Sequence, residues 1–335
     1  MKTGISYFHT RDPRHVERDL DDIVEHGCNF IVHCYSETDM AFYNQAVEKI
    51  IRLSKDRGLE VYLDPWGLGG LYGGETFSKF VAENLAARQI SVNGQSLPAA
   101  CPNSPDFISF QAQWTQRAAD LGADICFWDE PHYHFNFMDP SSWDNWACRC
   151  DVCRKLYKDE YNEDMPGELT SQVVQFRQQS LLRFLDKNCK DAKELGMRNC
   201  VCVLPDEGGE MMGQAAGTAA WEEIAGLSDI DIFGTDPYWA LFGGDVDEYV
   251  RKHCSRVKQL CDKYEKEAQA WVLAFILPED REEEVTQAID VMVETGIRNI
   301  AAWGYLGCHL IDIKCARPEL VWEILGKSFN KIKDR

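Results

Sequence analysis

The chain has 335 residues, 45% apolar and 27% charged, which suits one large α/β domain or two ordinary ones around a sizeable core. Its net charge of −20, without a basic run, argues against nucleic-acid partners and anionic membrane surfaces. No apolar run approaches a membrane span in length, and the first residues lack the apolar core of a signal peptide. We therefore expect a cytoplasmic protein, whose 14 cysteines bind metal or pack in the core rather than form disulfides.

Short apolar runs alternate with amphipathic segments from one end of the chain to the other. Continuous apolar runs are typical of parallel strands that are buried on both faces. In chain order they predict strands at 4–10, 29–35, 59–67, 123–131, 198–207, 230–239, 269–279 and 298–307. The amphipathic segments predict helices at 13–27, 43–58, 78–89, 110–122, 171–196, 219–229, 246–267, 282–296 and 318–332.

Eight strands, each followed by helix, predict an α/β protein with a (β/α)₈ TIM barrel that forms a single domain over residues 1–335. Several predicted helices end in glycine just before a strand, as expected for a left-handed helix cap. A doubly wound open sheet is the rival fold. The count of eight favours the barrel, as does the lack of a glycine-rich dinucleotide loop after the first strand. We accordingly expect no organic cofactor.

Polar and aromatic side chains gather where the predicted strands end, which is where a barrel carries its chemistry. In chain order these residues are His9, Asp64, Trp66, Trp128, Asp129, Glu130, His132, Asp236, Tyr238, Trp239, Glu279, Trp303 and Tyr305. Aromatic rings stack on the C–H faces of sugars, and carboxylates bind sugar hydroxyls and transfer protons. The pattern predicts a carbohydrate site, whereas any one of these residues alone is as readily explained as a structural group. Glu75 lies in a glycine-rich loop that either reaches this site or only forms turns.

Three cysteines stand close together after the fourth predicted strand, in a loop at about 140–160. Cys148, Cys150 and Cys153 form a C-x-C-x-x-C pattern, and such closely spaced thiols suggest a structural zinc ion. Tetrahedral zinc needs a fourth ligand, for which Cys101 is the best candidate because its loop precedes the same strand. Free thiols are the alternative.

These residues make the chain resemble the clan A glycoside hydrolases, and more narrowly a barrel-only relative of the family 42 β-galactosidases. Clan A enzymes carry Asn-Glu-Pro or a related sequence after strand four, and Asp129-Glu130-Pro131 occupies that place here. Zinc-containing family 42 members have a lone cysteine before strand four and a C-x-C-x-x-C cluster after it, as this chain does. The resemblance covers nearly the whole chain, without the extra domains of family 42. It also implies assembly into homo-oligomers.

The resemblance implies a glycosidase in which Glu130 is the general acid/base, acting on a small glycoside or oligosaccharide. The nucleophile of the clan is a Glu at the end of strand seven, but residues 269–279 carry no acid before Glu279. The second carboxylate is therefore Asp236 or Glu279. We favour Asp236, since it directly follows a strand. Asp129 replaces the asparagine that normally donates to the sugar 2-hydroxyl, and an ionised carboxylate only accepts there.

The other predicted site residues have expected roles in binding. The residues expected to stack on sugar rings are Trp66, Trp239, Trp303 and Tyr305. Two other functions remain open on the same barrel. His9, Asp129, Glu130 and His132 suit a divalent metal in a sugar isomerase or lyase. A carbohydrate-binding barrel without catalysis is the third reading.

Overall fold

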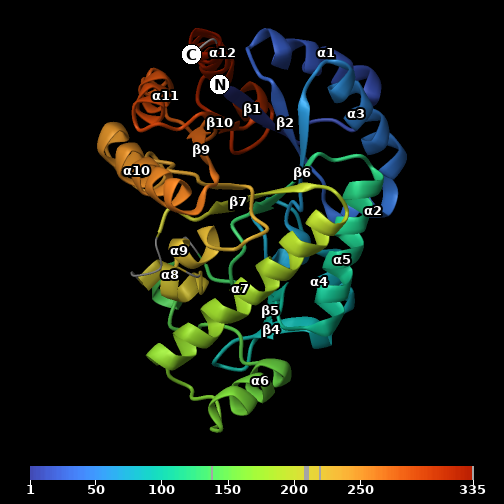
Figure 1. Ribbon diagram of the computed structural model, residues 1–335, viewed down its shortest axis with the longest axis vertical. Coiled ribbons are helices and arrows are strands. Elements are labelled where there is room, and N and C mark those ends of the chain that lie inside the picture. Colours follow the sequence, from blue (N-terminus) through green and yellow to red (C-terminus); the bar gives the residue numbers. More distant parts are fainter. Residues whose placement is uncertain (137–138, 207–210, 219, 334–335) are drawn as a thin grey trace.

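The computed structural model describes residues 1–136, 139–206, 211–218 and 220–333. Eight parallel strands close into a barrel, because the first strand pairs with both the second and the last. The strands are β1 (Lys2–Tyr7), β2 (Phe30–Cys34), β3 (Glu60–Asp64), β6 (Ile125–Asp129), β7 (Arg198–Val203), β8 (Ile232–Thr235), β9 (Glu267–Leu273) and β10 (Asn299–Trp303). The predicted (β/α)₈ barrel is confirmed (Figure 1).

The helices follow the strands and surround the barrel (Figure 1). They are α1 (Pro13–Glu25), α2 (Glu37–Phe42), α3 (Asn44–Asp56), α4 (Lys79–Glu83), α5 (Pro105–Asp120), α6 (Asp151–Tyr161), α7 (Ser171–Glu194), α8 (Met211–Ala216), α9 (Trp221–Ala225), α10 (Val246–Tyr264), α11 (Glu284–Glu294) and α12 (Pro318–Ile332). Short 3₁₀ turns occur at Leu68–Gly70, Leu85–Ala87, Pro140–Ser142 and Tyr305–Cys308. Within the described ranges, no helix is long and apolar enough to cross a membrane.

Helix starts follow the sequence closely, because several are fixed by side-chain caps. Asp12, Thr170 and Asp245 each accept a backbone N–H bond at the first turn of α1, α7 and α10. Ser36 and Asp39 form a reciprocal capping box at the start of α2. Residues 207 and 219, at the ends of one predicted strand and one predicted helix, lie outside the described residues.

The segment between β3 and α5 differs from the sequence prediction. A single helix was expected over 78–89, but α4 stops at Glu83 and an antiparallel hairpin follows, made of β4 (Arg88–Ile90) and β5 (Ser96–Ala100). Cross-strand pairing of residues 88–90 overrides their local helical pattern, as tertiary context often does. The hairpin and α6 lie at the same end of the molecule, beside α7 (Figure 1).

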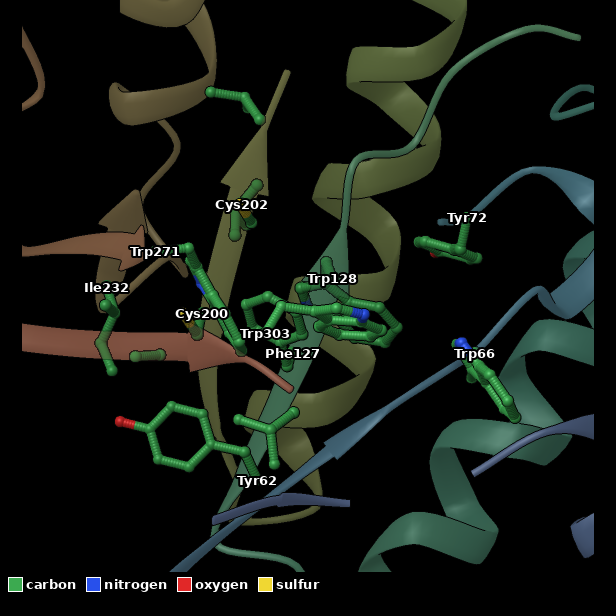
Figure 2. Close-up of a cluster of buried hydrophobic side chains, with 14 of the residues drawn as sticks. Tyr62, Trp66, Tyr72, Phe127, Trp128, Cys200, Cys202, Ile232, Trp271 and Trp303 are labelled. Atoms are coloured by element: carbon green, nitrogen blue, oxygen red, sulfur yellow. The ribbon is translucent and has the colours of Figure 1, made fainter. Parts of the chain in front are cut away.

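The barrel interior is filled by large aromatic side chains. Phe127 on β6 packs against Trp271 on β9 with ring centroids 5.0 Å apart, and Trp271 lies 5.8 Å from Trp303 on β10. These rings occupy the space between the strands in Figure 2. Trp128 follows Phe127 in the chain, yet it packs on Trp114 of α5, because successive strand residues point to opposite faces. The interior of the barrel is thus a packed core, and its chemistry lies at the rim above these rings.

Candidate active site

A pocket of about 230 Å³ opens at the carboxyl ends of the barrel strands. Four acids line it: Glu75 from the loop after β3, Asp129 and Glu130 at the end of β6, and Asp236 just after β8. His132 also lines it, and within the described part of the chain no lysine or arginine does. The structure thus brings together four of the residues that the sequence predicted for the site, namely Asp129, Glu130, His132 and Asp236.

Glu130 is held in a special backbone conformation at the point where β6 ends. Its φ angle is +42°, in the left-handed region that residues with a Cβ atom seldom adopt. Its N–H donates to the Cys202 carbonyl on the neighbouring β7 over 3.0 Å, and its own carbonyl accepts from His132 Nδ1 over 2.5 Å. Such backbone strain tends to occur at functional sites, where surrounding contacts hold it in place.

The Glu130 and Asp236 carboxyl groups lie close enough in the pocket to shift each other's pKa. Burial raises the pKa of both acids. The charge of Glu130 raises the pKa of Asp236 further, whereas interaction with Asp236 lowers the pKa of Glu130. Two buried carboxyls that interact in this way cannot both ionise at low energetic cost, so they titrate as a coupled pair.

Asp129 lies against the glycine-rich loop that follows β3. The Gly73 N–H donates to the Asp129 carbonyl over 3.0 Å, and a Cβ atom on Gly73 would come within 2.3 Å of the Asp129 carboxylate. Only glycine permits this approach. Burial raises the Asp129 pKa well above its ordinary value, with further increases from the charges of Asp64, Glu130 and Glu75.

Glu75 reaches the pocket, which decides between the two roles that the sequence left open for its loop. The indole Nε1 of Trp66 donates to Glu75 Oε2 over 3.1 Å. Burial raises the Glu75 pKa, and this hydrogen bond from Trp66 opposes the increase. Trp66 therefore orients an acid of the pocket instead of lining the pocket itself.

Aromatic rings form much of the remaining wall. Trp303 and Tyr238 line the pocket, as the sequence predicted for substrate-binding residues. Trp271 and Phe275 contribute further rings from β9 and the residues after it, and Phe242 adds another. Strand alternation could have suggested Trp271, since it lies on the same strand face as Gln269 and Leu273. Phe275 stands near the end of strand seven, where a clan A enzyme would carry its nucleophile.

Several residues predicted for substrate binding lie away from the pocket. The indole of Trp128 donates to Asn199 over 2.8 Å behind the barrel wall, and that of Trp239 donates to Glu284 over 2.6 Å. The Tyr305 hydroxyl donates to Asp22. The sequence located these residues at strand ends, but burial behind the wall gives them structural partners instead.

His9 and Asp64 are also set apart from the pocket. The His9 ring packs among Tyr7, Phe8 and Tyr305, with centroids 5.2–5.8 Å away. It is therefore not assembled with Asp129, Glu130 and His132 as the metal-dependent alternative requires. Asp64 is fully buried, and among the described residues neither of its oxygens has a hydrogen bond of normal geometry.

Glu279, the other candidate for the second carboxylate, is not brought to the pocket. Its side chain is 69% exposed and lies 4.0 Å from Arg317, which also pairs with Asp280 and Glu282. β9 ends at Leu273, so the chain turns away from the barrel rim before it reaches Glu279. Asp236 is the predicted second carboxylate that lines the pocket together with Glu130.

The four cysteines of the predicted metal site converge beside the hairpin. The Sγ atoms of Cys101, Cys148, Cys150 and Cys153 all lie within 4.8 Å of one another and are buried. In the part of the chain that the structure describes, this is the one group of His, Cys, Asp and Glu side chains close enough to hold a metal ion. Sulfur atoms around tetrahedral zinc are about 3.8 Å apart for bonds of about 2.3 Å. The Cys101–Cys153 and Cys101–Cys150 separations of 3.3 and 3.6 Å fit this size.

N–H groups surround the cysteine cluster in a way that suits thiolates. Ile90 N and Cys150 N donate to Cys148 Sγ over 3.5 and 3.4 Å, and Asn103 Nδ2 donates to Cys153 Sγ over 3.3 Å. The buried Arg177 guanidinium adds a positive charge that interacts with the cluster. Donors to the ligand sulfurs are typical of structural metal sites. The residues present therefore fit a structural zinc ion.

Comparisons with solved structures agree with the fold. An endo-1,4-β-mannanase from Rhizomucor miehei has a TM-score of 0.63 and 11% identity, over 98% of this chain and 95% of that one. The PgaB (BpsB) glycoside hydrolase domain from Bordetella bronchiseptica has a TM-score of 0.63 and 10% identity, over 97% of this chain and 99% of that one. A D-psicose 3-epimerase from Clostridium cellulolyticum H10 has a TM-score of 0.50 and 9% identity, over 99% of this chain and 98% of that one.

At such low identities these similarities establish the barrel fold alone. Two of the three neighbours are named as glycoside hydrolase proteins or mannanases and one as an epimerase, so the fold by itself does not select the reaction. No family model and no curated protein matches the chain. Function must therefore be argued from the side chains of the pocket.

Proposed function

We propose that the protein is a glycoside hydrolase that uses Glu130 as its general acid/base and Asp236 as its second carboxylate. The observation that carries the proposal is the interacting pair of these two acids in an aromatic-lined pocket at the carboxyl ends of the barrel strands. Paired carboxylates flanking the scissile bond are the usual apparatus of glycoside hydrolysis. Barrel neighbours that are glycoside hydrolases support the same class.

In this mechanism the Glu130 carboxyl donates its proton to the leaving oxygen as the glycosidic bond breaks. Burial raises its pKa, which favours the protonated state that a general acid needs. Trp303 and Tyr238 present ring faces and edges to the apolar side of the sugar. Asp129 and His132 lie beside Glu130 in the pocket wall, where they bind sugar hydroxyls.

The spacing of the Glu130 and Asp236 carboxyls determines the stereochemical outcome of the proposed reaction. Retaining enzymes hold their two carboxyls about 5–5.5 Å apart, whereas inverting enzymes keep about 6.5–9.5 Å to admit a water molecule. In a retaining reaction Asp236 attacks the sugar and forms a glycosyl-enzyme, which water then hydrolyses with Glu130 as the base. In an inverting reaction Asp236 activates the attacking water. The anomeric configuration of the first product, followed by NMR, distinguishes the two.

The relationship to family 42 rests on the residues and not on the comparisons, which do not single out that family. The Cys101, Cys148, Cys150 and Cys153 cluster supports it, because these four cysteines would hold a structural zinc ion that fixes their loops. Asp129 in place of asparagine and the missing strand-seven acid depart from it. We therefore propose a small glycoside or oligosaccharide as the substrate without assigning galactose.

Hydrolysis of a panel of aryl glycosides by the wild type and Glu130→Gln tests the proposal. Removing the general acid is expected to lower turnover about 10²–10⁴-fold with poor leaving groups. The loss should be much smaller with a dinitrophenyl leaving group, which departs without a proton. Asp236→Asn should lose activity with both kinds of leaving group, because it removes the group that attacks the sugar or activates the attacking water.

Glu279→Gln provides the matched control, since it changes an exposed carboxylate that does not line the pocket. It is expected to keep wild-type activity. Loss of activity in Glu279→Gln with full activity in Asp236→Asn would reverse the assignment of the second carboxylate. If no glycoside is hydrolysed but Glu130→Gln still binds sugars, the protein is a carbohydrate-binding barrel instead.

A further inference from the structure

A second, larger cavity also borders Glu130. It has a volume of about 620 Å³ and shares Glu130, His132, Gly73 and Gly74 with the first pocket. Most of the remaining wall comes from the loop after β3, from α4 and from the β4–β5 hairpin. Glu130 is the one acid of the described residues that lines both spaces.

The position of Glu130 assigns the two spaces to the two halves of a glycoside. A general acid protonates the oxygen that joins the sugar being cleaved to its leaving group, so it must lie at the boundary between their sites. Asp236 belongs to the first pocket only, which makes that pocket the site of the sugar whose bond is attacked. The second cavity then holds the leaving group, an inference that rests on the proposed function.

The two spaces differ in charge. The first pocket has four acids in its wall, whereas Glu130 is the one acid among the described residues that line the second. Arg88 lines the second cavity together with His132 and His134, and burial lowers the pKa of both histidines, so Arg88 is the cation of this wall. An arginine beside the proposed cleavage point is notable in a chain with a net charge of −20 and suggests a ligand of opposite charge.

The fold holds the Arg88 guanidinium in place but gives it no acidic partner among the described residues. Its Nε donates to the Val81 carbonyl on α4 over 2.8 Å, which holds the guanidinium along the cavity wall. Among the described residues, Arg88 makes no ion pair, and its two terminal nitrogens make no hydrogen bond to the protein. A guanidinium whose two terminal nitrogens are free is suited to bidentate binding of a carboxylate or another oxyanion.

Hydrogen bonds hold the cavity wall around Arg88 in place. The Gln89 side chain links the hairpin to the active-site segment, because its Oε1 accepts from His134 N over 3.0 Å while its Nε2 donates to the Ala100 carbonyl over 2.9 Å. The next residue, Cys101, donates its N–H to Ala87 and belongs to the cysteine cluster. At the rim, Phe77 is 99% exposed, which leaves an aromatic face available to a sugar ring.

We propose that the second cavity is a leaving-group subsite that selects a sugar bearing a carboxylate, such as a uronic acid, through Arg88. The carboxylate binds the free guanidinium edges, and the ring lies against the exposed Phe77. The natural substrate is then an acidic oligosaccharide with its uncharged sugar in the first pocket. Sulfated or phosphorylated sugars carry related oxyanions, and the experiment separates them from the uronic acid.

Binding measurements by titration calorimetry on the full-length Glu130→Gln protein test this proposal without requiring turnover. The probes are methyl glucuronide, methyl glucoside, glucose 6-sulfate and glucose 6-phosphate. Methyl glucuronide is expected to bind at least about tenfold more tightly than methyl glucoside, the range given by one charge-assisted hydrogen-bonded pair. Arg88→Met, added to Glu130→Gln, should remove this preference, and Arg88→Lys should keep part of it because the charge remains.

Arg52→Met is the matched control, since it changes an exposed arginine on α3 that pairs with Glu48. It should leave the preference for the uronic acid intact. Equal binding of the neutral and acidic sugars, or a preference that persists in Arg88→Met, overturns the proposal. Tighter binding of the sulfate or phosphate than of the glucuronide overturns the choice of a uronic acid. Circular dichroism of each variant checks folding, and Arg88→Lys gives a second test if Arg88→Met does not fold.

The outcomes also separate this inference from the proposed function. An Arg88-dependent preference in a protein that hydrolyses no glycoside would keep the subsite and reject the hydrolase. Hydrolysis of neutral aryl glycosides without any such preference would keep the hydrolase and reject the subsite.

Discussion

Trp66 donates a hydrogen bond from its indole to the Glu75 carboxylate over 3.1 Å. The same indole fills the space beside Gly74, where a Cβ atom would come within 2.1 Å of the ring, and Gly74 has a φ of +124°. The two contacts fix the glycine-rich loop so that Glu75 faces the pocket that contains Asp129 and Glu130. The arrangement of this loop thereby sets the charge around the proposed general acid.

Glu75→Gln should shift the pH dependence of hydrolysis. Burial raises the Glu130 pKa, and the negative charge of Glu75 raises it further. The acid must be protonated to work, so kcat/KM falls as pH rises through this raised pKa. Removing the charge of Glu75 lowers the Glu130 pKa, and the alkaline limb of the profile should therefore move to lower pH. Glu83→Gln, which changes an exposed acid paired with Lys79, should leave the limb in place.

Asp64→Asn is expected to stabilise the fold at neutral and higher pH. Burial raises the Asp64 pKa well above its ordinary value, with a smaller increase from Glu75. For an acid whose pKa is raised by folding, the stabilising contribution is complete below the unfolded pKa and is lost as pH rises through the folded pKa. An amide ionises in neither the folded nor the unfolded state, so the variant does not lose this contribution as pH rises, a difference that we expect to be worth about 1–3 kcal/mol at pH 8.

Urea unfolding of the wild type and Asp64→Asn at pH 8 and at acidic pH measures this difference. It should shrink as pH falls, because the Asp64 carboxyl then becomes protonated in the unfolded wild type as well. Asp312→Asn changes an exposed acid and should have little effect at either pH. A destabilised Asp64→Asn at pH 8 would mean that the carboxylate has a partner that the variant loses.

Zinc analysis by mass spectrometry should find about one ion per chain. Cys148→Ser should lose it, because it removes one of four converging sulfurs, whereas Cys28→Ser changes a buried cysteine outside the cluster and should retain it. Binding to the folded state alone stabilises by about 2.7 kcal/mol when free zinc is a hundred times its Kd. Chelation should accordingly lower Tm in the wild type but not in Cys148→Ser. Wild-type protein without zinc after purification in zinc-containing buffer would leave the cluster as free thiols.

Two tryptophans that are equally prominent in the sequence should respond differently to substitution. Trp303→Ala removes a ring from the pocket wall and should lower kcat/KM at least about tenfold, in line with an aromatic contact worth about 1.5 kcal/mol. Trp128→Phe removes the donor to Asn199 behind the barrel wall and should cost about 1–2 kcal/mol of stability with kcat/KM almost unchanged. Denaturant unfolding and steady-state kinetics on both variants distinguish the roles. Reversed effects would mean that Trp128, not Trp303, contacts the sugar.

The sequence by itself determined the barrel and the end of it that carries the chemistry. Eight buried apolar runs separated by amphipathic helices leave few ways to bury both faces of every strand, and a closed parallel sheet is one of them. Glu130 and Asp236 directly follow β6 and β8, so their nearness follows from strand order in a closed barrel. The cysteine cluster was predictable for a similar reason, since three of its members lie within six residues.

Only the tertiary structure decided which side chains at the strand ends face the pocket. Phe127 and Trp128 are both apolar neighbours on a strand with two buried faces, so composition does not reveal that the first lies inside and the second outside. Glu75 and Arg88 belong to loop and hairpin, whose paths depend on contacts with Trp66 and α4 rather than on local propensity. Glu279 lies at the end of its predicted strand in the sequence, but in the structure its side chain is exposed and does not line the pocket. Which acids line the pocket therefore depends on burial and on contacts between segments that are distant in sequence, and no local pattern encodes these.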